Sequence, residues 1–121
     1  MAKIQVDFDD KKLRTNVRRF PNQLRRNISS VVDRRAAITQ AELRIKAPWT
    51  DRTGAARSGL FAIPIHGRSF EEIYMAYSVT YGIWLEIAND RKYAIITPMT
   101  RIAGQALMND LKGLIDRMEL S

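Results

Sequence analysis

The sequence predicts an α+β fold with a long N-terminal helix, an antiparallel sheet of about four strands and a C-terminal helix. Apolar residues recur every three, four or seven positions between residues 13 and 45, which is typical of one helix face. Polar and apolar residues alternate over residues 3–8 and 72–79, as they do in half-buried strands. A second helical spacing of leucines, from Leu107 to Leu114, leads to the end of the chain.

The length and composition indicate one folded domain, residues 1–121. The 45% hydrophobic content is normal for a globular chain and too high for a disordered one. No apolar run approaches the roughly 18 residues that a membrane-spanning helix needs, and the first residues lack the pattern of a signal peptide. The chain has no cysteine, which excludes disulfides and thiolate metal sites and suits a reducing compartment without proving one.

After a short strand at residues 3–8, the helical pattern is interrupted by Pro21. This proline either kinks one long helix or starts a second helix at its first turn, where its missing N–H costs little. We expect a short helix over residues 10–19 and a long one over residues 21–46. The apolar side chains expected along this helical stripe are Leu13, Val17, Phe20, Leu24, Ile28, Val31, Ile38 and Ile45.

Pro48 ends the long helix, because the residue before a proline is pushed out of the α region. Residues 49–59 are expected to form a loop, and a strand over residues 60–65 follows it. Pro64 confines that strand to an edge of the sheet or to its own end, since proline cannot donate a ladder hydrogen bond. A turn at residues 66–69 then leads into the alternating strand.

The last third of the chain is expected to hold a short helix near residues 80–88, a brief strand at residues 93–96 and the C-terminal helix. Thr97-Pro98 is typical of a helix start. Gly104 and Gly113 each weaken that helix by roughly 1 kcal/mol, so its stability should depend on packing.

The positive charge is concentrated near the N-terminus. Residues 1–35 hold ten Lys/Arg against four Asp, so they carry +6 of the net charge of +7. Such an arm predicts an acidic neighbour, either nucleic acid or an acidic protein surface. The arginines on the expected basic face either are simply solvated or contact phosphates without reading sequence. They are Arg14, Arg18, Arg25 and Arg26.

Residues suited to catalysis or metal binding are few, and we expect no enzyme, no metal and no cofactor. His66 is the one histidine, and its turn-like surroundings favour a solvated side chain over a general base. A triad or a zinc site would need further histidines or cysteines. The adjacent Glu71 and Glu72 should point to opposite faces of a strand, so they cannot form a carboxylate dyad.

Two segments together carry a resemblance to a known family. Residues 47–60 read Ala-Pro-Trp-Thr-Asp-Arg-Thr-Gly-Ala-Ala-Arg-Ser-Gly-Leu, after a long helix rich in alanine and arginine. Residues 81–86 read Tyr-Gly-Ile-Trp-Leu-Glu, and residues 92–98 read Lys-Tyr-Ala-Ile-Ile-Thr-Pro before the final helix. This order resembles the minor tail, tail-completion or head–tail neck proteins of tailed bacteriophages, over most of residues 10–120. The chain departs from the family at residues 89–91, where many relatives carry a glycine-rich segment.

The resemblance implies a structural protein of the virion, assembled in the cytoplasm of the host bacterium. Copies would form a homo-oligomeric ring in the neck or tail-completion layer, against adjacent neck and tail proteins. Duplex DNA would pass through the lumen without sequence-specific binding, and no membrane would be involved. The alternative is a nonspecific nucleic-acid-binding protein that uses the basic N-terminal helix.

The residues of the two segments are suited to subunit or partner contacts. Asp51 can bond backbone N–H groups two residues on and so fix a turn that aims Arg52 and Arg57 outward. Trp49 either anchors this loop on the core or reaches a neighbouring subunit. Glu86 is left for a salt bridge or a subunit contact.

Overall fold

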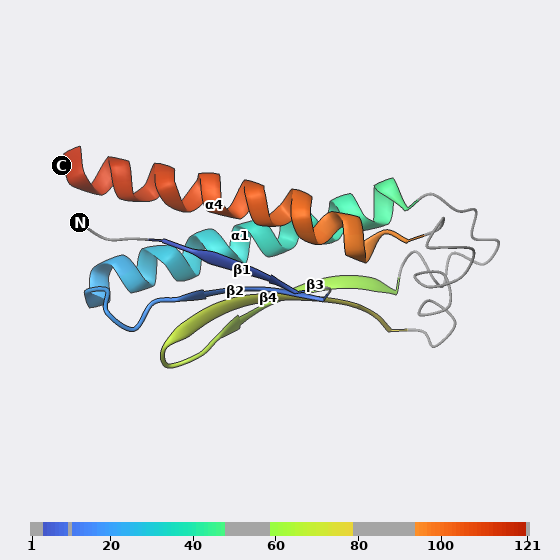
Figure 1. Ribbon diagram of the computed structural model, residues 1–121, viewed down its shortest axis with the longest axis horizontal. Coiled ribbons are helices and arrows are strands. Elements are labelled where there is room, and N and C mark those ends of the chain that lie inside the picture. Colours follow the sequence, from blue (N-terminus) through green and yellow to red (C-terminus); the bar gives the residue numbers. More distant parts are fainter. Residues whose placement is uncertain (1–3, 10, 48–58, 79–93, 121) are drawn as a thin grey trace.

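The computed structural model describes residues 4–9, 11–47, 59–78 and 94–120, and these ranges form two long helices and one sheet (Figure 1). The elements in chain order are β1 (Val6–Asp9), β2 (Lys12–Asn16), α1 (Asn22–Lys46), β3 (Leu60–His66), β4 (Phe70–Tyr77) and α4 (Ile96–Leu120). The predicted α+β class, with its long N-terminal and C-terminal helices, is confirmed. The short helix expected near residues 80–88 lies outside the described residues.

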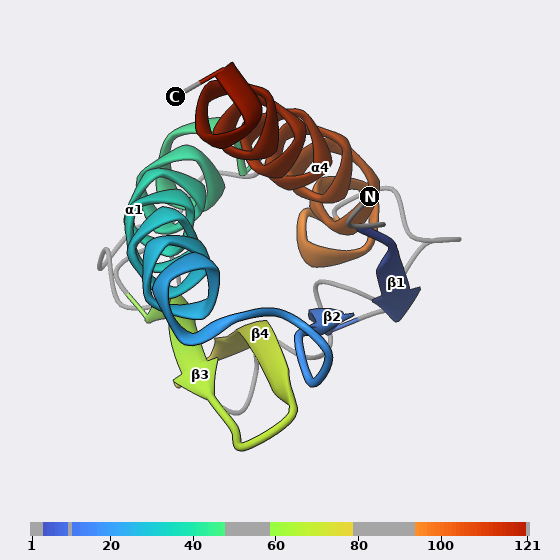
Figure 2. The same ribbon diagram turned by 90° about the vertical axis from the view of Figure 1, so that its left-hand side faces the viewer.

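The four strands form one antiparallel sheet in the order β1-β2-β4-β3. Both helices lie on the same face of this sheet, with α1 over the β3 side and α4 over the β1 side (Figure 2). The core fills the space between the two layers, and its centre includes the fully buried Leu13, Ile28, Ile73 and Leu111. No described element covers the other face of the sheet, which we call the outer sheet face.

The short helix expected over residues 10–19 is wrong, because residues 12–16 form β2. Leu13 and Thr15 are buried toward the helices, whereas Arg14 and Asn16 point to the outer sheet face and are exposed. Side chains four residues apart share a face in a helix and also in a strand, so the step from Leu13 to Val17 fits both structures. The pairing of β2 with β1 and β4 decides for the strand.

Helix α1 starts directly after Pro21 and ends at Lys46, close to the predicted bounds. Its predicted apolar stripe is partly wrong, because the exposed fraction rises along the heptad steps from 8% at Leu24 and 7% at Val31 to 36% at Ile38 and 77% at Ile45. A straight helix drifts by about 20° per heptad, so a strict seven-residue spacing rotates out of the core. The side chains that are buried instead at the C-terminal half are Ala36, Thr39 and Leu43.

Strand β3 lies at an edge of the sheet, as Pro64 predicted. Side chains of α1 satisfy backbone groups at this edge. The N–H of Ala62 donates to Gln40 Oε1 at 3.2 Å, and Arg44 Nε donates to the carbonyl of Leu60 at 2.9 Å. These bonds satisfy two backbone groups that would otherwise be open to strand pairing with another chain.

Helix α4 begins at Ile96, two residues before Pro98, so this proline lies in the first turn, where its missing N–H is tolerated. The brief strand expected at residues 93–96 is therefore wrong where the structure describes it, since residues 94 and 95 are not in a strand. Arg35 of α1 and Asp110 of α4 form an ion pair at 2.7 Å that joins the two helices. None of the helices in the described ranges is long and apolar enough to cross a membrane.

Candidate functional site

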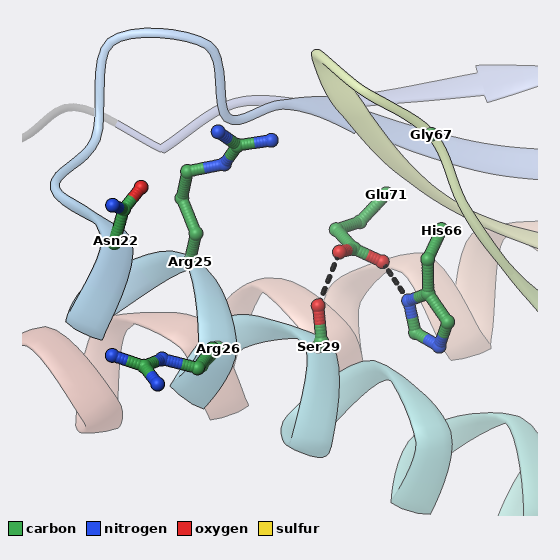
Figure 3. Close-up of a pocket in the computed structure, with 7 residues that line it drawn as sticks. All are labelled: Asn22, Arg25, Arg26, Ser29, His66, Gly67 and Glu71. Carbon is green, nitrogen blue, oxygen red and sulfur yellow. Dashed lines mark hydrogen bonds and ion pairs between the residues drawn. The ribbon is translucent and has the colours of Figure 1, made fainter.

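A chain of hydrogen bonds links α1 to the hairpin of β3 and β4 (Figure 3). Ser29 Oγ donates to one oxygen of the Glu71 carboxylate, and His66 Nδ1 contacts the other. His66 Nε2 lies 2.8 Å from Asp33 Oδ1, one helical turn beyond Ser29 on α1. Glu71 is only 4% exposed, so this arrangement satisfies a carboxylate inside the protein. We call Ser29, Asp33, His66 and Glu71 the His66 array.

The contacts of the array favour a protonated histidine. Both ring nitrogens face carboxylate oxygens, which only accept, and a neutral imidazole has one donor nitrogen. Burial by itself lowers the pKa of His66, but hydrogen bonds and charge attraction from Glu71 and Asp33 outweigh it and raise that pKa above the ordinary 6.5. The protonated form of His66 therefore pairs with a buried carboxylate. Its side chain is 40% exposed at the end of β3, so the solvent exposure that the sequence indicated is present, whereas these two partners were not predicted.

The array lacks the serine–histidine contact of a Ser-His-Asp triad. The hydroxyl of Ser29 donates to Glu71 and does not bond the ring of His66, whose two nitrogens contact Glu71 and Asp33. Within the described ranges, no group of three His, Asp or Glu side chains is arranged to hold a metal ion. The array instead ties two layers of the fold together and fixes the local charge.

An open cleft of about 410 Å³ lies beside the array, between the start of α1 and the β3–β4 turn. Figure 3 shows Arg25 and Arg26 projecting from the first turns of α1 on the side of the cleft away from His66. Arg25 also donates to the carbonyl of Arg68 in the turn. The cleft is lined by Asn22, Arg25, Arg26, Ser29, His66, Gly67 and Glu71.

The four arginines of the predicted basic face do not share one helix face. Arg14 lies on the outer sheet face, where it pairs with Glu72 at 2.7 Å and stacks over the Phe70 ring at 4.0 Å. Arg18 follows β2 in the connection to α1, and its backbone N–H donates to Asn16 Oδ1. Only Arg25 and Arg26 are brought together, at the cleft. The other predicted contact residues, Trp49, Asp51, Arg52, Arg57 and Glu86, lie outside the described residues.

Sequence reasoning singled out His66 but missed its partners. Ser29 and Asp33 come from α1 and Glu71 from β4, so no local motif connects them. The opposite orientation of Glu71 and Glu72 was predicted and is confirmed, since Glu71 reaches α1 while Glu72 pairs with Arg14 on the outer sheet face. The alternation separated the two carboxylates but did not predict which of them faces α1.

The outer sheet face carries apolar side chains over β3 and β4. Phe61, Ile63 and Ile65 alternate along β3 on this face, and Tyr74 of β4 pairs with Ile63. The rings of Phe61 and Tyr74 are 6.4 Å apart, and Ile63 is 43% exposed. In the described part of the molecule, the face is apolar over one half and charged over the half formed by Arg14 and its neighbours.

Comparisons with models of protein families, with curated proteins and with solved structures find no match to this chain.

Proposed function

We propose that the chain is a structural protein of a tailed-phage particle, a ring-forming component of the head–tail neck or tail-completion layer around the DNA channel. The proposal joins the resemblance of residues 47–60, 81–86 and 92–98 to one structural observation. That observation is the apolar outer sheet face, which the described helices leave uncovered.

An apolar face of this kind favours a protein partner. A two-layer domain buries one face of its sheet under the helices, and its other face is normally polar. Here Phe61, Ile63 and Tyr74 lie on the free face. Contiguous apolar surface on a small protein is typical of interaction sites.

A ring requires two different contact surfaces on each subunit, because each copy binds the next one head to tail. The helical layer carries two exposed apolar side chains. Ile45 of α1 is 77% exposed and Ile102 of α4 is 52% exposed, and both belong to the layer opposite the outer sheet face. A small chain with exposed apolar groups on both layers is suited to head-to-tail association.

The alternative, nonspecific nucleic-acid binding, still has the basic N-terminal segment in its favour. Such binding needs a concentrated row of free cations along the duplex backbone. Arg14 is engaged by Glu72 and lies on the layer opposite Arg25 and Arg26, so these three do not make one row. A DNA conduit has no need for that row, since a lumen that gripped DNA would slow its passage.

Inactivation of the gene in the phage that carries it tests the proposal. We expect DNA-filled heads and separate tails, or tails of aberrant length, by electron microscopy of lysates, and rescue by the gene supplied in trans. Normal infectious particles from the null mutant would contradict a structural role in the virion.

A further inference from the structure

We infer that the cleft between the start of α1 and the β3–β4 turn is a binding site for a carboxylate side chain of another protein. Arg25, Arg26 and Asn22 would hold the carboxylate, and the protonated His66 array would keep the cleft positive. This inference names the chemistry of a partner surface and does not require that partner to be a phage protein.

The charges around the cleft leave a positive surplus. The cations that line the cleft are Arg25 and Arg26 of α1 and His66 when it is protonated; the anions are Glu71 of β4, which lines the cleft, and Asp33 of α1, which contacts His66. Three cations against two anions leave one uncompensated positive charge, and a neutral His66 would leave none. The imidazolium thus prevents Glu71 from cancelling the arginines across the cleft.

The donors that face the cleft are not used up by the protein itself. Arg25 donates one N–H to the carbonyl of Arg68, and a guanidinium has five N–H donors. No described carboxylate pairs with Arg25 or Arg26, and no described side chain bonds the Asn22 amide. The first turn of α1 also has no acidic residue and no side-chain cap, so the positive end of the helix dipole adds to the same field.

A protein carboxylate fits this site better than a DNA backbone does. The cleft of about 410 Å³ is a single recess between a helix and a turn, so it offers room for one anionic group rather than for a run of backbone phosphates. Duplex binding would need further cations that continue beyond the recess, whereas Arg14 is paired with Glu72 on the other side of the sheet. A single side chain needs only the recess.

The test is a titration of the purified chain with an N-acetylated tetraglutamate peptide, followed by NMR shifts of residues 22–29 and 66–71. Tetraglutamine and a short DNA duplex serve as comparison probes. We expect Arg26→Gln to weaken peptide binding by about tenfold, the scale of one charge-assisted hydrogen bond. Arg34→Gln is the matched control, because Arg34 is an exposed arginine of α1 outside the cleft and the charge change is the same.

A second arm follows the pH. Wild-type affinity for tetraglutamate should fall as the pH rises through the pKa of His66, and His66→Gln should make that dependence flat. Equal losses from Arg26→Gln and Arg34→Gln, or no localised shifts, would overturn the inference. Tighter binding of the duplex, lost with Arg26, would also overturn it in favour of nucleic acid. All of these measurements use the isolated chain, so their results do not depend on whether the chain takes part in phage assembly.

Discussion

Replacing Gly104 with alanine should fail to stabilise α4, although this change usually strengthens a helix. A Cβ built on Gly104 would lie 2.7 Å from Cζ of Phe8 and closer still to Cε1, so the ring of β1 occupies the space that the methyl group needs. Gly113, in the same helix, is the matched control. Its Cβ would meet only Arg117 Nη1, at 3.5 Å, which is ordinary van der Waals contact.

The magnitude follows from two opposing terms. Alanine gains about 1 kcal/mol over glycine inside a helix. Forcing an extra methyl group into a packed core costs about 1–3 kcal/mol, and the lower part of this range applies here because Phe8 is 48% exposed and its ring can partly move aside. Gly113→Ala should therefore stabilise the protein by about 1 kcal/mol, whereas Gly104→Ala should lie between no change and a loss of about 1 kcal/mol.

Urea denaturation followed by circular dichroism measures both variants, and a Phe8→Ala background isolates the cause. Without the ring, Gly104→Ala should become stabilising by about 1 kcal/mol, as at Gly113. This sign reversal gives a coupling energy between the two positions. Equal stabilisation by Gly104→Ala and Gly113→Ala in the native background would refute the docking of β1 on α4 through this contact.

Three further outcomes are expected in denaturation experiments. A double-mutant cycle with Arg35→Gln and Asp110→Asn should give a coupling energy of about 1–2 kcal/mol, between the values for exposed and buried ion pairs. The two side chains are 17% and 19% exposed. A coupling energy near zero would contradict an ion pair between Arg35 and Asp110. Ile28→Ala should cost about 2–5 kcal/mol, whereas Ile45→Ala should stay within about 0.5 kcal/mol; similar losses would contradict the rotated stripe. Because the pKa of His66 is raised in the folded state, the array stabilises the fold fully below pH about 6.5 and less as the pH rises through the folded-state pKa. The free energy of unfolding of a His66→Gln variant should lack this pH dependence. The same pH dependence in the variant and the wild type between pH 6 and 8.5 would contradict the role of His66.

Periodicity predicted the elements whose patterns fit one structure only. The steps from Leu24 to Ile28 and Val31 admit only a helix, and the alternation through Ile73 and Met75 admits only a strand. Residues 12–16 were assigned wrongly because steps of four residues satisfy both periods, and only pairing with β1 and β4 decides between them. The pairing with β4 is long-range, since Leu13 lies opposite Ile73, and it leaves no local mark in the sequence.

The candidate site could be predicted only in part, for the same reason. The sequence singled out His66 because it is the one histidine of the chain. It also predicted that Glu71 and Glu72 point to opposite faces, because side chains alternate along a strand. The contacts with Ser29 and Asp33 depend on how α1 lies across the hairpin of β3 and β4. That placement is set by the core between the layers, which no local pattern describes.

The location of the chain in mature particles tests the central proposal most directly. Quantitative mass spectrometry of purified phage, together with gold labelling of a tagged chain in electron micrographs, measures its presence, copy number and position. We expect several copies per particle and label at the junction of head and tail. Absence of the chain from purified infectious particles would contradict the proposal.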